Sequence, residues 1–197
     1  MSKNALLIFT KNPVYGKVKT RLAATVGNDK ALEVYKELIQ YTYSATQEID
    51  THKIVFYDEA IEENDIWKDG YKKQVQQGDD LGEKMMNAFI YAFNNNCNNV
   101  VIIGTDCAEL TASIINKAFE QLYNYDVVIG PAADGGYYLL GMKNTHNDLF
   151  ENIQWSSPTV LLETIQRCKE NSLHYFLLKE LHDVDKEQDL IYMKHIL

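Results

Sequence analysis

The sequence carries a dense cluster of positive charge near its start. Lys11, Lys17, Lys19 and Arg21 fall within eleven residues of a chain whose formal net charge is -9. Lysine ammonium groups attract phosphates as point charges, and an arginine binds one phosphate through two parallel hydrogen bonds. The cluster therefore predicts a binding site for a triphosphate or for pyrophosphate, and the alternative is a solvated basic turn. A Walker A loop is excluded, because Val18 occupies the position of its serine or threonine.

Three aspartates have the type and position of ligands for a hard divalent cation. Asp106 follows the apolar residues 100–104, and the end of a buried strand is a rigid place for a carboxylate. Asp183 and Asp185 point to the same side if their segment is extended. Mg²⁺ is usually bound by one or two carboxylates together with phosphate oxygens of the substrate. The alternative is structural, because an aspartate in such positions can also cap the helix that follows.

Residues 130–138 place paired glycines directly after an aspartate. Gly135 and Gly136 allow a tight turn in which the backbone and Asp134 come close to a ligand. A turn that only joins two strands is the alternative, since Asp-Gly is typical of hairpins.

Hydrophobic periodicity predicts the elements that must position these residues. Apolar runs indicate strands at residues 5–10, 53–57, 100–104, 126–130, 137–142 and 175–178. Helical spacing and capping residues indicate helices from Asn28 or Asp29 to 48, at 81–94, from Thr111 to 123, from Pro158 to 170, and at 187–195. Strands that alternate with helices predict an α/β fold of three layers, α/β/α, with a mostly parallel sheet and ligands at the carboxyl ends of its strands.

Composition bounds the class of protein. A chain of 197 residues predicts a single domain, and 46% hydrophobic and 24% charged residues are typical of a globular protein. The negative charge argues against sequence-independent nucleic-acid binding. The three cysteines form no CxxC pair, which fits a cytoplasmic protein without a disulfide framework or zinc site. The apolar run near the start is too short for a membrane span.

Five segments in this order resemble the bacterial GT-A-fold transferases of unassigned function that are described as glycosyltransferases. These are related to phospholactate guanylyltransferase and molybdenum-cofactor guanylyltransferase. The segments are residues 11–22 (KNPVYGKVKTRL), 77–85 (QGDDLGEKM), 104–110 (GTDCAEL), 130–139 (GPAADGGYYL) and 183–190 (DVDKEQDL). The chain departs from the pattern at Ala108, where proline is usual, and at Lys186-Glu187, where Thr-Pro is usual.

The resemblance implies a nucleotide-diphospho-sugar transferase (GT-A, Rossmann-like) fold over residues 1–197, with Mg²⁺ or Mn²⁺ as cofactor. Asp106 would hold the metal together with Asp185 or Asp183, and Lys19, Arg21 and Asp106 would be catalytic. The implied nucleotide and phosphate contacts are Lys11, Lys17, Lys19, Arg21, Gln77, Gly78, Asp80 and Gly82. The implied acceptor contacts are Asp134, Gly135, Gly136, Tyr137 and Trp155, although Trp155 would equally serve as an apolar plug under the following helix.

The function implied is metal-dependent nucleotidyl transfer from a nucleoside triphosphate to a small phosphorylated acceptor. Glycosyl transfer from a nucleotide sugar is the alternative, weakened by the lack of Asp-x-Asp where Thr105-Asp106-Cys107 stands. A non-catalytic nucleotide sensor is the alternative outside the enzymes.

Overall fold

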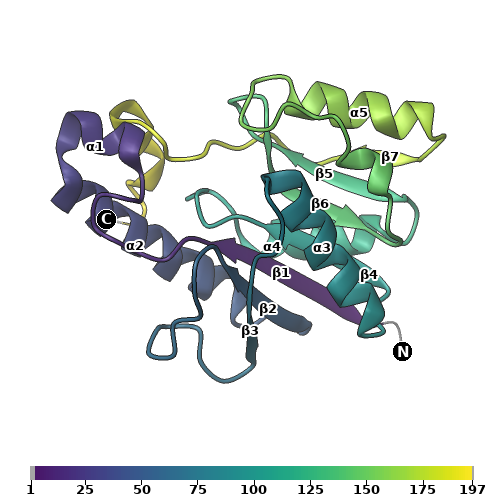
Figure 1. The fold of residues 1–197 in the computed structure, drawn as a ribbon, viewed down its shortest axis with the longest axis horizontal. Helices are drawn as coiled ribbons and strands as arrows, with labels where there is room; N and C mark the ends of the chain where they lie inside the picture. Colours follow the sequence, from purple (N-terminus) through teal and green to yellow (C-terminus); the bar gives the residue numbers. More distant parts are fainter. Residues whose placement is uncertain (1–2, 197) are drawn as a thin grey trace.

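A mixed β-sheet forms the middle layer of the molecule (Figure 1). The structure is a computed structural model, and it describes residues 3–196. Within these residues the sheet has seven strands in the order β3-β2-β1-β4-β6-β5-β7. The strands are β1 (Asn4–Thr10), β2 (His52–Tyr57), β3 (Tyr71–Val75), β4 (Asn99–Ile103), β5 (Val127–Pro131), β6 (Tyr137–Met142) and β7 (Tyr175–Leu177). Only β6 runs against its neighbours β4 and β5, so the predicted mostly parallel α/β sheet is confirmed.

Helices cover both faces of this sheet. They are α1 (Thr20–Val26), α2 (Asn28–Thr46), α3 (Leu81–Asn94), α4 (Ala112–Gln121) and α5 (Val160–Glu170), with the 3-10 helices η1 (Asn147–Leu149) and η2 (Glu187–Met193). Alternate residues of a strand point to opposite faces. Leu6 and Ile8 accordingly pack with α2 and α4, whereas Leu7 packs with α3 and α5. Because both faces are covered, the central strands are continuously apolar, as the sequence indicated.

The sequence predicted most of these elements within one or two residues. The bounds of α3 and β6 agree with the prediction, whereas α1, β3 and η1 were not expected. Strand β3 has the sequence YKKQV and lies at an edge of the sheet, so it lacks the apolar signal of a buried strand. The predicted last helix is a 3-10 helix, η2.

Two capping predictions have different outcomes. The prediction that Asn28 or Asp29 caps α2 is wrong, because Gly27 occupies the N-cap position at φ 84 and also ends α1. Thr111 caps α4 as predicted, since its side chain accepts a hydrogen bond from the backbone N–H of Ile114. Asp106 is therefore not the cap of this helix.

Strands β1 and β4 end side by side. They are parallel neighbours, and Ile8 lies opposite Ile103. The chain leaves β1 toward β2 on one side, whereas β4 lies on the other, so the strand order reverses here. Such a reversal opens a crevice at the carboxyl ends of the strands. None of the helices in the described part of the chain combines the length and apolar composition needed to cross a bilayer.

Candidate functional site

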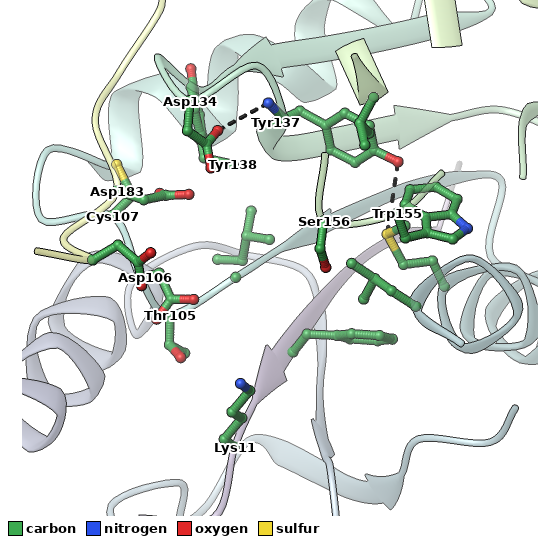
Figure 2. Close-up of a pocket in the computed structure, with 18 of the residues that line it drawn as sticks. Lys11, Thr105, Asp106, Cys107, Asp134, Tyr137, Tyr138, Trp155, Ser156 and Asp183 are labelled. Atoms are coloured by element: carbon green, nitrogen blue, oxygen red, sulfur yellow. Dashed lines mark hydrogen bonds between the residues drawn. The ribbon is translucent and has the colours of Figure 1, made fainter. Parts of the chain in front are cut away.

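A cavity of about 850 Å³ lies at the carboxyl ends of β1 and β4. The cationic residues that line it are Lys11, Lys19, Arg21, Lys84 and Lys186. The carboxylates that line it are Asp58, Asp106, Asp134, Asp183 and Asp185. Figure 2 shows Asp106 and Asp183 together on one side, with Ser156 and Trp155 on the opposite side and Lys11 near the end of β1. The fold thus brings together residues from all five segments singled out in the sequence.

Tyr35 of α2 joins the ends of the two central strands beneath this cavity. Its hydroxyl donates a hydrogen bond to the carbonyl of Lys11 at 3.1 Å and accepts one from the Lys11 backbone N–H at 2.7 Å. The same oxygen lies 3.3 Å from the hydroxyl of Thr105. Burial, and then the Asp106 carboxylate, raises the pKa of Tyr35 to about 12. The hydroxyl therefore stays protonated and acts as a fixed tie between the strands.

The cationic loop is fastened at its start by the buried side chain of Asn12. Its amide oxygen accepts hydrogen bonds from the backbone N–H groups of Glu59 and Ala60, both at 3.2 Å. Its amide nitrogen donates to the carbonyl of Ala60 at 2.9 Å. Lys17 points away from the cavity and pairs with Glu59 at 2.9 Å. The four cations therefore divide, and Lys17 belongs to the loop's outer surface.

Lys19 and Arg21 each reach a carboxylate that the sequence marked as a metal ligand. The Lys19 ammonium lies 2.6 Å from Asp106 Oδ1, and only 5% of the Lys19 side chain is exposed. Its backbone has φ 48, a left-handed conformation that costs a non-glycine residue free energy and persists where the surroundings hold it. The Arg21 guanidinium lies 2.7 Å from Asp185 Oδ2, and this pair is much more exposed.

Asp183 lies where several negative charges act on one carboxyl group. An isolated bridge pairs Cys107 with Asp183, and the Val184 N–H donates to the Asp106 carbonyl at 2.9 Å. Burial, and then the Asp106 carboxylate, raises the pKa of Asp183 to about 7; Lys19 opposes this effect, and Asp134 and Asp185 add to it. A cation placed among these carboxylates would stabilise their ionised forms.

The geometry allows a metal site at which the protein supplies only some of the ligands. Within residues 3–196 no group of three or more His, Cys, Asp or Glu side chains is arranged to hold a metal ion. Mg²⁺ needs no such protein cage, because it takes one or two carboxylates and fills its other positions with water and substrate phosphate. Asp106 and Asp183 lie together and fit that requirement, although Asp106 is paired with Lys19 as Asp185 is with Arg21.

The turn between β5 and β6 forms a further wall of the cavity. Asp134 Oδ1 accepts a hydrogen bond from the Gly136 N–H at 2.9 Å, and both residues line the cavity with Tyr137. Gly135 faces away, and a Cβ there would lie 2.1 Å from the carbonyl oxygen of Pro158. The segment is thus a turn joining two antiparallel strands, and it also lines the cavity.

The 77–82 segment builds the start of α3. Asp80 caps the helix by accepting a hydrogen bond from the Glu83 N–H at 2.9 Å, and Glu83 accepts one from the Asp79 N–H at 2.9 Å. A Cβ on Gly78 would lie 2.7 Å from Glu83 Cβ, and one on Gly82 would lie 2.3 Å from the Trp155 indole nitrogen. The residues with implied nucleotide contacts in this segment all lie outside the cavity lining: Gln77, Gly78, Asp80 and Gly82.

The polar cavity residues that were not selected from the sequence include Tyr35, Gln76, Lys84 and Ser156. The helical spacing of residues 81–94 carried a usable signal for Lys84, because Lys84 lies one turn after Leu81, which also lines the cavity. Gln76 reaches the carbonyl of Phe56 at 3.0 Å, a contact that depends on the pairing of β2 with β3. That pairing follows from an edge strand the sequence did not reveal.

The protein has three layers, with the cavity where the strand order reverses between β1 and β4. This is the fold of the nucleotide-diphospho-sugar transferases, as matching solved structures show. The chain belongs to the family described as uncharacterized proteins conserved in bacteria (DUF2064), whose profile matches residues 42–157. A provisionally assigned nucleotide-diphospho-sugar transferase from Desulfovibrio desulfuricans G20 is 34% identical, with a TM-score of 0.89 over 96% of this chain and 85% of that chain.

Two more distant structures share the fold alone. The inositol-1-phosphate CTP transferase from T. maritima is 12% identical, with a TM-score of 0.63 over 99% of this chain and 96% of its own. The CMP:2-keto-3-deoxy-manno-octonic acid synthetase complexed with CTP is 11% identical, with a TM-score of 0.62 over 99% of this chain and 98% of its own. No curated protein matches the chain in sequence. The implied kinship with guanylyltransferases stays a prediction.

Proposed function

We propose that this protein is a transferase that binds a nucleotide donor in the β1–β4 cavity and transfers its nucleotidyl group to a small-molecule acceptor. One observation carries the proposal: Lys11, Lys19 and Arg21 meet Asp106 and Asp183 in a single cavity at the reversal of strand order. Cations for phosphates and carboxylates for a metal are the two elements that phosphoryl chemistry requires. The fold shared with known cytidylyltransferases supports the same proposal.

The cations would bind the phosphates of the donor. Lys11 lies at the end of β1, while Lys19 and Arg21 already stand at the cavity as counterions of Asp106 and Asp185. Exposed ion pairs of the Arg21–Asp185 kind contribute only about 0–1 kcal/mol, so exchanging a carboxylate for a phosphate costs little. Arg21 would then bind the phosphate through two hydrogen bonds.

Asp106 and Asp183 would hold Mg²⁺ or Mn²⁺ between them and the donor phosphates. Their fit rests on geometry, because Asp106 and Asp183 both line the cavity and the bridge between Cys107 and Asp183 brings the two aspartates together. Such an ion supplies positive charge to the oxygens of the departing phosphates. Asp185 is the weaker candidate as the partner of Asp106, because the bridge to Cys107 places Asp183 beside Asp106, whereas the Asp185 carboxylate holds Arg21.

The chemical step places little covalent work on the protein. An acceptor oxygen attacks the α-phosphorus of a nucleoside triphosphate, a new P–O bond forms, the bond to the β-phosphate breaks, and pyrophosphate leaves. Lys19 and Arg21 stabilise the charge that develops on the leaving group. The acceptor oxygen releases its hydroxyl proton in the same reaction.

Glycosyl transfer is the second candidate, and similarity favours it. The protein that is 34% identical over 96% of this chain is named for transfer from nucleotide-diphospho-sugars. In that reaction the acceptor oxygen attacks the sugar carbon, and a nucleoside diphosphate leaves in place of pyrophosphate. Thr105-Asp106-Cys107, which lacks the Asp-x-Asp pattern, remains the observation against it.

The test is a panel of nucleoside triphosphates and nucleotide sugars, each with and without Mg²⁺ or Mn²⁺. A bound ligand raises the melting temperature by mass action, and product analysis separates pyrophosphate from nucleoside diphosphate. We expect at least one nucleotide to raise the melting temperature of the wild type and of Lys17→Ala, but much less that of Lys19→Ala. Equal shifts in the two variants would refute the proposed phosphate site, and binding without any product would indicate a nucleotide sensor.

A further inference from the structure

The cavity has two walls of different chemical character. The donor wall lies at the ends of β1 and β3, where Lys11 and Gln76 follow these strands and line the cavity. The acceptor wall consists of cavity-lining residues from the β5–β6 turn to the start of α5, and it includes Asp134, Tyr137 and Trp155. Figure 2 shows Ser156 and Trp155 near the Tyr137 ring, with Asp134 on the side of Asp183. The side chains of the acceptor wall determine which molecule it can bind.

Four of the cavity's five cations belong to segments outside the acceptor wall. Lys11 follows β1, and its backbone is held by Tyr35 of α2. Lys19 and Arg21 are engaged by Asp106 and Asp185. Lys186 adjoins Asp185, and so belongs to the side near α1.

The fifth cation, Lys84, is placed by the geometry of α3. Gly82 lies under the Trp155 indole, and Phe89, seven residues later on the same side of the helix, lies 6.0 Å from the ring of Phe150. Tyr91 lies 6.0 Å from the ring of Phe56 in β2. Lys84 is seven residues before Tyr91, which is two helical turns, so it faces the β2 side. Lys84 and Trp155 therefore lie toward different sides of α3, although both line the cavity.

The acceptor wall itself has no positive side chain. The described cavity-lining residues from 134 to 160 include the carboxylate of Asp134 and hydroxyls of Tyr137, Ser156 and Ser157, but no lysine or arginine. A phosphate bound there would lie near a carboxylate with no charge-assisted partner, which is unfavourable on both counts.

Two features of this wall suit hydroxyl groups on a carbon skeleton. Asp134 uses one hydrogen bond to hold Gly136, and an ionised carboxylate can accept about four. Trp155 is partly exposed in the cavity while Gly82 supports its indole from behind. An aromatic ring packs well against C–H groups, and a carboxylate accepts from the hydroxyls beside them.

We propose that the acceptor is an uncharged polyhydroxylated molecule, a sugar or polyol, bound between Trp155 and Asp134, and not the phosphorylated acceptor expected from the sequence. This inference rests on the proposed function, because it assigns the second substrate of the same cavity. It holds for nucleotidyl and for glycosyl transfer, since a hydroxyl oxygen of the acceptor can attack either the α-phosphorus or the sugar carbon.

The experiment compares matched neutral and phosphorylated probes by ligand-observed NMR with the full chain: glucose and glucose 6-phosphate, myo-inositol and inositol 1-phosphate, glycerol and glycerol 3-phosphate. We expect at least one neutral probe to bind about tenfold or more tightly than its phosphate ester. Trp155→Ala and Asp134→Asn should each weaken binding of that neutral probe, whereas Lys17→Ala, on the outer surface of the loop, should leave it unchanged. Trp155→Phe, which keeps a ring, should retain most of the binding if Trp155→Ala folds poorly.

The outcomes separate this inference from the proposed function. Preferred binding of the phosphate esters, or no binding of any neutral probe, would overturn the sugar or polyol assignment. Neither result would affect nucleotide binding, which the melting temperatures measure independently. Neutral binding that survives both Trp155→Ala and Asp134→Asn would also overturn it, because the probe would then lie elsewhere.

Discussion

The cationic loop at residues 11–21 and the segment at residues 77–82 look alike in sequence, yet they serve different purposes in the structure. Both combine glycine with charged side chains, and both belong to the resemblance. In the loop, Lys19 and Arg21 end at the cavity on carboxylates from distant segments. In the other segment, Asp80 and Glu83 satisfy the backbone N–H groups at the start of their own helix.

The difference teaches how to separate binding residues from scaffold residues. A charged side chain whose hydrogen bonds close on its own helix end has stabilised that helix, and it is not available to a ligand. A charged side chain held only by another charge across a cavity can exchange its partner for substrate. Variants in the two regions should therefore divide cleanly between activity and stability.

The largest effect is expected at Asp106. Asp106→Asn removes the counterion of Lys19 and one proposed metal ligand while preserving shape, so turnover should fall by roughly 10²–10³, the loss typical for one electrostatic group at a reacting centre. The melting temperature without nucleotide should change little, because half of the Asp106 side chain is exposed. Steady-state kinetics at saturating Mg²⁺ check this. Full activity there would remove Asp106 from the reaction.

Gly82→Ala tests whether the helix start supports the acceptor wall. The added methyl group would overlap the Trp155 indole, and overpacking of this kind costs about 1–3 kcal/mol. Trp155 should move, so acceptor KM should rise while nucleotide affinity stays the same. Calorimetry with the nucleotide and kinetics with the acceptor separate the two readouts. A loss of nucleotide affinity instead would return this segment to the donor site.

The sequence predicted a helix or strand where a local pattern of residues indicates it. The periodicity of residues 81–94 and the apolar run at 137–142 reproduce α3 and β6 because buried faces impose those patterns. The edge strand β3 carries little apolar signal, and α1 is a helix of seven residues that was not recognised. Cys107 is buried, and burial raises its pKa to about 12.

The ion pairs of the site could not have been predicted from spacing. Arg21 and Asp185 are 164 residues apart in sequence, and only the fold brings α1 next to the C-terminal segment. The sequence identified both residues as functional candidates but assigned them separately, one to phosphate and one to metal. The two residues pair because the fold places them close together, and a local sequence pattern cannot show such a contact.

A smaller effect is expected at Asp80, the cap of α3. Asp80→Ala should lower stability by about 1 kcal/mol, whereas Asp80→Ser should keep the cap and nearly all of the stability. Nucleotide affinity should be equal in both variants if the cap is the residue's whole role. Chemical denaturation and nucleotide titration measure the two quantities. An affinity loss shared by Ser and Ala would show that Asp80 contacts the ligand after all.

The smallest effect on stability is expected at Asp185, where holding Arg21 and binding the metal are hardest to tell apart. The residue does not accept a capping hydrogen bond for η2; that part is taken by Asp189, whose carboxylate accepts from the N–H groups of Asp185 and Lys186. Its carboxylate instead holds Arg21 in an exposed pair, so Asp185→Asn should cost less than about 1 kcal/mol of stability.

The nucleotide affinity of the same variant decides the role of Asp185. If the carboxylate only holds Arg21, the substitution frees that guanidinium, because an amide binds it less strongly than a carboxylate does. Nucleotide should then bind equally well or up to about 1 kcal/mol more tightly, and the dependence on Mg²⁺ should not change. If Asp185 is the second metal ligand, a higher Mg²⁺ concentration will be needed for the same turnover. Titrating Mg²⁺ at fixed nucleotide, with Asp183→Asn as the comparison, distinguishes the two, since our proposal requires the shift at Asp183 and none at Asp185.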